Sequence, residues 1–170
     1  MPVLIGLVDP KSPTNVGAVL RAAGCYQADA VRYTGSRYDR AARYQTDTHG
    51  AAERIPLERV AAMTEELPAS IKLVCVELVE GATPLPLFEH PVDALYVFGP
   101  EDGTLEQSLI DQADAVVYVP TEGCMNLAAS VNVVLYDRLA KSPNAAGNTE
   151  QLLKSRDTNN RIRVRKTTPD

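Results

Sequence analysis

The stretch from Asp93 to Gly103, DALYVFGPEDG, joins a short apolar run to a turn rich in glycine and proline. The run Asp93–Phe98 predicts a buried strand, because it is short, apolar and closed by turn residues. Four further runs predict strands in the same way: Val3–Val8, Ala30–Tyr33, Ile71–Val76 and Ala115–Val119.

Segments with helical spacing lie between these strands. Apolar residues at Val16, Val19, Leu20 and Ala23 predict a helix from Asn15 to about Tyr26, with Thr14 as its N-cap. Further helices are predicted at Leu57–Leu67, which ends before Pro68, at Leu105–Asp111, and at Asn126–Ala140, with an apolar stripe at Leu127, Val131, Val134 and Leu135. Residues 35–50 are interpreted as a loop with room for one helical turn, and residues 81–91 as irregular. Strands that alternate with helices predict an α/β domain with a mostly parallel sheet flanked by helices.

Bulk composition is that of a globular protein. The chain has 170 residues, of which 45% are apolar and 23% charged, which is enough for one domain with a sizeable core. We expect no membrane span and no signal peptide, because no apolar run approaches ~18 residues and the first residues carry no basic segment. The three cysteines are far apart in sequence and predict neither a disulfide framework nor a metal site. These features favour a cytoplasmic protein without a structural metal.

Charge is unevenly distributed along the chain. The net charge is −5, but residues 1–60 carry a balance of +2, residues 61–137 of −12 and residues 138–170 of +5. Basic ends can approach a polyanion despite a negative total, although such charges can equally be a solvated surface. After Lys141 the composition turns polar and charged, so we expect a domain at 1–141 and a basic tail, or a loosely attached helix, at 142–170.

Several common ligand-binding sites are not encoded. The sequence contains no G-x-G-x-x-G, no G-x-x-x-x-G-K-[ST] and no G-x-S-x-G, which removes the main support for a dinucleotide-binding domain, a P-loop NTPase or an α/β-hydrolase. The glycine- and proline-rich loops follow the later strands, so the site is expected in the C-terminal half. His49 and His90 fall in predicted loops, and we interpret both as surface residues.

Three segments together resemble the motifs of SpoU/TrmH-type RNA methyltransferases of the SPOUT superfamily. They are Asn15–Arg21 (NVGAVLR), Phe98–Leu105 (FGPEDGTL) and Val119–Pro120 followed by Cys124–Leu127 (CMNL) and the helix to Asp137. The resemblance covers about Val3–Leu139. It implies transfer of a methyl group from S-adenosyl-L-methionine (SAM) to a ribose 2′-hydroxyl in tRNA or rRNA. It also implies a homodimer and a deep C-terminal trefoil knot.

The resemblance assigns catalytic positions to Asn15, Arg21, Glu101 and Asn126. By local reasoning alone, Asn15 could support the helix start, Arg21 could pair with a surface carboxylate and Glu101 could stabilise a turn. An arginine side chain stays protonated in proteins, so we expect Arg21 to hold a phosphate and to stabilise the developing alkoxide. Whether it also takes the proton is left open.

The resemblance places the cofactor in the later loops. The expected cofactor-binding residues are Val76, Gly99, Gly103, Val119, Pro120, Cys124, Met125 and Leu127. Relatives commonly have serine where this chain has Cys124, and sulfur is a weaker hydrogen-bonding atom than a hydroxyl oxygen. We therefore expect any role of that serine to be weakened, or taken over by Thr121 or Ser130.

RNA contacts are predicted from basic residues. Arg37, Arg40 and Arg43 recur every three residues, interleaved with Tyr38 and Tyr44, which suits phosphate contact and base stacking. The tail residues Arg161, Arg163, Arg165 and Lys166 form either a second basic arm or a solubilising disordered end. With no separate RNA-binding domain expected, the dimer itself would form the RNA platform.

Two rival functions remain open at this point. The first is a SPOUT enzyme that methylates a base instead of a ribose. The second is an RNA-binding protein of the same fold without catalysis, which the cysteine at position 124 favours. The target RNA and its nucleotide are not encoded in any pattern that we recognise.

Overall fold

A computed structural model gives the fold and describes residues 2–42 and 55–164. The strands are β1 Val3–Leu7, β2 Ala30–Tyr33, β3 Leu57–Arg59, β4 Lys72–Val76, β5 Thr83–Pro84, β6 Ala94–Phe98 and β7 Ala115–Tyr118. They form one 7-stranded sheet in the order β3-β2-β1-β6-β4-β7-β5, and every pair in this order is parallel. The α/β architecture predicted from the alternation of elements is confirmed.

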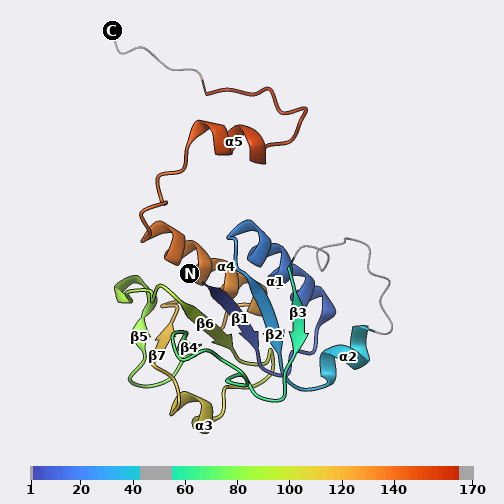
Figure 1. Cartoon of the computed structure of the whole chain (residues 1–170), viewed down its shortest axis with the longest axis vertical. Helices are drawn as coiled ribbons and strands as arrows, with labels where there is room; N and C mark the ends of the chain where they lie inside the picture. Colours follow the sequence, from blue (N-terminus) through green and yellow to red (C-terminus); the bar gives the residue numbers. More distant parts are fainter. Residues whose placement is uncertain (1, 43–54, 165–170) are drawn as a thin grey trace.

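Helices cover the sheet unequally (Figure 1). They are α1 Pro13–Cys25, α2 Arg37–Ala42, α3 Gln107–Ile110, α4 Leu127–Ala140 and α5 Thr149–Ser155. Helices α1 and α4 pack against each other on one face of the sheet. The expected apolar positions of both helices are buried, among them Val16, Val19, Val131 and Val134. The other face is covered by α3 and by the turns that follow β3.

The central strand β6 is buried along its whole length. Tyr96 and Phe98 point to the α1–α4 layer, whereas Leu95 and Val97 point to the opposite layer. Such a strand is apolar without alternation because both of its faces are covered. The carboxyl ends of β1, β6, β4 and β7 lie side by side in this register, and the three sequence motifs follow β1, β6 and β7.

Helix α1 begins two residues earlier than its apolar spacing suggests. Ser12, not Thr14, is the N-cap, and its hydroxyl accepts a hydrogen bond from the Asn15 amide at 3.3 Å. Proline suits the first turn of a helix because it lacks an N–H that would have no partner there. Pro13 therefore starts the helix, and the prediction of Thr14 as the cap is wrong.

The predicted helix at Leu57–Leu67 is also wrong. Residues Leu57–Arg59 form β3, paired in parallel with β2, and turns follow it. Arg32 donates hydrogen bonds to the Met63 and Glu65 carbonyls, at 3.2 and 3.0 Å, which removes acceptors that a helix would use. Glu66 has φ +50, which no α-helix accommodates. Tertiary pairing with β2 thus overrides an apolar spacing that is compatible with a helix.

The remaining segments largely follow the prediction. The expected helical turn after Gly35 is α2, and the irregular segment 81–91 contains the two-residue strand β5 and a 3₁₀ turn. The tail contains α5, drawn apart from the sheet in Figure 1, whose side chains are exposed. The boundary at 141 and the trefoil knot stay predictions. Within the described ranges, no helix has both the length and the apolar character needed to cross a membrane.

The side chain of His90 is enclosed by the protein, contrary to the surface position expected from its loop. Its side chain is 5% exposed, with Nδ1 2.7 Å from the Tyr96 hydroxyl and Nε2 2.8 Å from Asp137 Oδ2. Arg138 donates to the Tyr96 oxygen, so the Tyr96 hydroxyl donates to Nδ1, and Nε2–H donates to the Asp137 carboxylate. Asp137 is also paired with Lys141 at 2.7 Å. This network fits a neutral His90 and ties the end of α4 to the segment before β6.

We predict that the free energy of unfolding falls as pH drops through about 6.5, the ordinary pKa of histidine. Burial lowers the pKa of His90 although the Asp137 carboxylate opposes this, so the unfolded chain binds more protons than the folded one in this range. Urea unfolding at about pH 7.5 and about pH 5.5 should show the loss. The loss should shrink in His90→Gln and persist in the control His49→Gln, whose position lies outside the described residues. An equal loss in both variants and the parent would contradict the assignment.

Candidate functional site

A cavity of about 170 Å³ opens at the carboxyl ends of β4, β6 and β7. This is the edge at which α/β sheets bind ligands. Seven of the eight expected cofactor residues line it: Val76, Gly99, Gly103, Val119, Cys124, Met125 and Leu127. Pro120 is exposed and is not among the lining residues.

Gly99 is needed for close approach and not for backbone conformation. A Cβ added at Gly99 would lie 3.2 Å from Glu77 Oε2 and 3.5 Å from the Leu105 amide nitrogen. The residues described with positive φ do not include Gly99 or Gly103. The glycine at position 99 therefore serves the close packing of the turn after β6 against Glu77 and Leu105.

The three sequence motifs meet in one hydrogen-bonded contact beside the cavity. The Asn15 side-chain nitrogen donates to Glu101 Oε1 at 3.1 Å, and the Asn126 side-chain nitrogen donates to Asn15 Oδ1 at 3.1 Å. Asn15 comes from the first turn of α1, Glu101 from the turn after β6 and Asn126 from the N-cap of α4. We refer to these three residues as the three-motif contact.

Glu101 is held as a carboxylate. Its two oxygens accept hydrogen bonds from the amides of Lys11, at 3.0 Å, and Ser12, at 3.2 Å, besides the bond from Asn15. Burial by itself would raise the pKa of Glu101, but these hydrogen bonds outweigh burial and lower the pKa below its ordinary value. The carboxylate thus fixes the loop before α1 against the turn after β6.

Asn126 also starts α4. Its side-chain oxygen accepts hydrogen bonds from the amides of Ala128 and Ala129, at 2.9 and 3.3 Å. The backbone oxygen of Asn126 accepts a hydrogen bond from the Ser130 hydroxyl at 3.2 Å. Because the oxygen of the amide caps the helix, its nitrogen is left to point at Asn15. One residue therefore couples the helix start to the candidate site.

Arg21 lies apart from the other three expected catalytic residues. It is six residues beyond Asn15 on α1, which is about 9 Å along the helix axis and on a different face. Arg21 is exposed and is not among the residues that line the cavity. Among the described residues it has no hydrogen-bond or ion-pair partner, so its guanidinium is free to meet another molecule.

The cysteine of the third motif is exposed at the cavity. Cys124 lines it together with Thr121 and Ser130. The Thr121 hydroxyl donates to the Gly123 carbonyl at 2.9 Å. Both hydroxyls proposed as substitutes for the family serine are therefore at the cavity, although each donates to a backbone carbonyl.

The arginines predicted to bind RNA differ from one another. Arg37 is paired with Asp9 and Asp102, so its charge is compensated inside the protein. Arg40 is exposed on α2. Arg43 lies outside the described residues, as do Arg165 and Lys166 of the tail, whereas Arg161 and Arg163 are exposed.

Sequence reasoning missed Glu77. It follows β4 directly, lines the cavity, and its carboxylate accepts hydrogen bonds from the amides of Leu105, at 3.0 Å, and Leu78, at 2.9 Å. The only available signal was its place as the first polar residue after a predicted strand. No group of metal-ligating side chains occurs among the residues for which the structure gives positions.

Comparison with known proteins identifies the family and the fold of the chain. Residues 2–136 match the model of the SpoU rRNA Methylase family. No curated protein matches the chain. An rRNA methyltransferase from Sinorhizobium meliloti is similar, with a TM-score of 0.68 and 19% identity over 81% of this chain and 55% of that one.

Two further structures share the fold. A TrmH/SpoU tRNA modifying enzyme from A. aeolicus has a TM-score of 0.70 and 15% identity, over 89% of this chain and 84% of that one. The SpoU methyltransferase AviRb from Streptomyces viridochromogenes, in complex with AdoMet, has a TM-score of 0.67 and 20% identity, over 82% of this chain and 57% of that one. This chain thus spans little more than half the length of AviRb and of the S. meliloti enzyme. Because the family model matches well over half of the sequence, the chain belongs to the SpoU rRNA methylase family.

Proposed function

We propose that this chain transfers a methyl group from SAM to the ribose 2′-hydroxyl of a nucleotide in tRNA or rRNA, in the cytoplasm. The observation that carries the proposal is the three-motif contact, which joins residues of three distant segments beside one cavity. Relatives of the same fold support it. One is named an RNA 2'-O ribose methyltransferase, and another is described by the 2-OH methylation of C/U34 on tRNA.

Two properties of the cavity favour SAM: its charged side chains are carboxylates, and Gly99 allows a ligand to approach the backbone closely. Among the described lining residues, the charged side chains are Glu77 and Glu101, and none is basic. A cavity lined by carboxylates favours a cation, and SAM carries a positive sulfonium. That sulfonium supplies the methyl group on a good leaving group. Gly99 lets backbone and ligand approach closely beside Glu77.

The chain's own residues would hold the ribose. Glu101 and Asn126 fix the Asn15 amide in one orientation, because each bonds a different atom of it. A side chain held in this way can orient an acceptor hydroxyl without losing further conformational freedom, which lowers the barrier of a bimolecular step. We assign this orienting role to Asn15 and Asn126, with Glu101 as the anchor.

Arg21 is assigned to the negative charge that develops on the ribose oxygen. In one chain it does not reach the cavity, so the assignment requires that Arg21 act from a second copy. We therefore propose a homodimer whose interface includes the exposed side of α4, where Tyr136 is 62% and Leu139 40% exposed. We also propose that residues 120–125 are threaded to form the trefoil knot expected of the family, and that Arg40 contacts RNA.

The dimer has a direct test. We expect the protein to sediment as a dimer at the concentrations at which it methylates RNA, because each site needs a residue from both copies. Analytical ultracentrifugation over a dilution series, with activity measured on the same samples, checks this. A monomer with full specific activity would contradict the dimer.

Methyl transfer itself is tested by binding and incorporation. Calorimetry with SAM should show one binding site per chain, and incubation with RNA and isotopically labelled SAM should move the label into RNA. A chain that binds RNA but not SAM would be the non-catalytic rival, and this outcome would overturn the proposal.

A further inference from the structure

Arg37, the first residue of α2, is held by two carboxylates from distant parts of the chain. Its Nε lies 2.8 Å from Asp9 Oδ2, and one of its terminal nitrogens lies 2.9 Å from Asp102 Oδ1. Nε also donates to the Asp9 carbonyl at 3.0 Å. Asp9 follows β1 and Asp102 lies in the turn after β6, so Arg37 joins α2 to both strand ends. We call Asp9, Arg37 and Asp102 the clamp.

Both carboxylates of the clamp are seated by further contacts. A Cβ added at Gly35, which has φ +78, would lie 2.0 Å from Asp9 Oδ1, so only glycine leaves room for the Asp9 side chain. Asp102 also accepts a hydrogen bond from the Lys11 ammonium at 3.1 Å. The hydrogen bond from Arg37, followed by that from Lys11, lowers the pKa of Asp102. Asp102 therefore stays charged at neutral pH.

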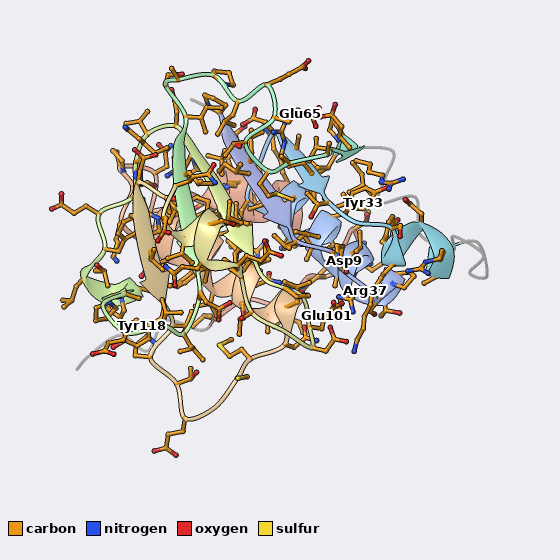
Figure 2. The ribbon with its side chains drawn as sticks, turned by 90° about the horizontal axis from the view of Figure 1, so that it is seen from below. Asp9, Tyr33, Arg37, Glu65, Glu101 and Tyr118 are labelled. Atoms are coloured by element: carbon orange, nitrogen blue, oxygen red, sulfur yellow. The ribbon has the colours of Figure 1, made fainter. Side chains whose placement is uncertain are left out.

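The residues of the clamp are close in sequence to the residues that bind the Glu101 carboxylate. Asp102 is the next residue after Glu101, and Asp9 precedes Lys11 and Ser12, whose amides donate to the Glu101 carboxylate. Figure 2 shows Asp9, Arg37 and Glu101 gathered at one edge of the molecule, away from Tyr118. Without Arg37, the Glu101 carboxylate and the Lys11–Asp102 ion pair would be left to hold the two loops together.

We propose that Arg37 is a positioning residue, which clamps the loop after β1 to the turn after β6 and so holds Glu101 against Asn15. The Arg37 guanidinium binds the two carboxylates and does not contact RNA, although the regular spacing of arginines in this segment predicted an RNA contact. Its side chain is 27% exposed, and a phosphate would have to displace two carboxylates from it. The consequence for turnover rests on the proposed function; the consequence for the loops does not.

A substitution at Asp102 distinguishes a positioning role of Arg37 from a role in RNA binding. Asp102→Asn keeps the arginine but removes the negative charge of its partner and leaves a single acceptor oxygen, at an exposed position, so the fold should survive. We expect the kcat of methyl transfer to fall about tenfold, within the ~10²-fold cost that a misplacement of ~1 Å can reach. The dissociation constant for RNA should change no more than in Asp111→Asn, a matched change of charge on an exposed residue at the end of α3. Tighter RNA binding with undiminished kcat would mean that Arg37 had been freed for RNA, and would overturn the proposal.

The salt dependence of RNA binding gives a second readout. An arginine that contacts phosphate contributes about 0.7–0.9 to the slope of log affinity against log salt. Arg37→Gln should leave this slope unchanged while it lowers kcat. Arg40→Gln, on the same helix and exposed, should lower the slope if Arg40 meets RNA. A slope lowered by Arg37→Gln with kcat intact would contradict the clamp.

Hydrogen exchange tests the clamp without any reaction. In Asp102→Asn, the amides of Lys11 and Ser12 should exchange faster than in the parent and in Asp111→Asn, because their acceptor Glu101 is less firmly held. Faster exchange in a protein that transfers no methyl group would refute the proposed function and keep the clamp. Unchanged exchange together with unchanged kcat in an active enzyme would refute the clamp alone.

Discussion

Arg21→Ala should lose most of the turnover while it binds SAM with unchanged affinity. A ribose hydroxyl is a poor nucleophile until its developing negative charge is stabilised, and Arg21 is the one cation that the catalytic assignment offers. Removal of one preorganised donor costs ~10²–10³ in rate in other enzymes. SAM affinity should hold because Arg21 is not among the residues that line the cavity. Single-turnover kinetics beside SAM calorimetry checks both expectations.

A conservative variant serves as the control, and two outcomes would contradict the assignment. Arg21→Lys should rescue little, since a point charge does not reproduce the planar fork of the guanidinium. Near-normal turnover in Arg21→Ala would refute the assignment. A matched loss of SAM binding would instead make Arg21 a structural residue of α1.

Mixed dimers decide which copy supplies Arg21. Arg21→Ala and Gly99→Val should each be inactive alone. If Arg21 acts on the cavity of the partner, a mixed dimer contains one site with both lesions and one intact site. Random mixing in equal amounts should then recover roughly a quarter of the parent activity, by the symmetry of a two-site dimer. No recovery would place Arg21 and the cavity of one chain in the same site.

Gly99→Val should abolish SAM binding with little effect on the fold. The new side chain would start 3.2 Å from Glu77 Oε2 and 3.5 Å from the Leu105 amide, and its methyl groups would displace that carboxylate or enter the cavity. Gly99 lies after the end of β6 and is only half-buried, so the sheet itself should be undisturbed. Calorimetry measures SAM affinity, and thermal unfolding measures the fold.

A smaller substitution at Gly99 and a substitution at a second glycine serve as controls. Gly99→Ala should weaken SAM binding less, because the end of the Glu77 side chain can move by a few tenths of an ångström. Gly24→Ala, where an added Cβ would be 3.8 Å from the nearest atom outside its own helix, should leave SAM affinity unchanged. Normal SAM affinity in Gly99→Val, with the fold intact, would mean that the cofactor binds elsewhere.

The sequence predicted the features that depend on periodicity. The strand Ala94–Phe98 and the apolar stripe of α4 could be predicted, because the spacing of their apolar residues matches the positions that are buried. The sequence-based prediction failed where contacts with distant segments of the chain determine the conformation. Leu57–Arg59 is a strand because β2 lies beside it, and the carbonyls that would have continued a helix are bonded to Arg32.

The candidate site divides in the same way. The resemblance of the three motifs predicted Asn15, Arg21, Glu101 and Asn126 as one group; the structure links Asn15 to Glu101 and to Asn126, whereas Arg21 lies apart. The sequence could not predict that Glu77 faces the cavity or that Arg37 is paired with Asp9 and Asp102, since these contacts depend on which strand ends become neighbours. The free guanidinium of Arg21 also became visible only in three dimensions.

The most direct measurement is the chemical identity of the methylated product. RNA incubated with the enzyme and SAM is digested completely with alkali, and the fragments are analysed by mass spectrometry. A ribose whose 2′-oxygen carries a methyl group cannot form the alkoxide that attacks the neighbouring phosphodiester in alkali. The account therefore predicts that the methyl group appears in an alkali-resistant dinucleotide, and that Arg21→Ala yields far less of it. A methyl group recovered on the base of an ordinary mononucleotide, or no methylated RNA from a SAM-bound enzyme, would contradict it.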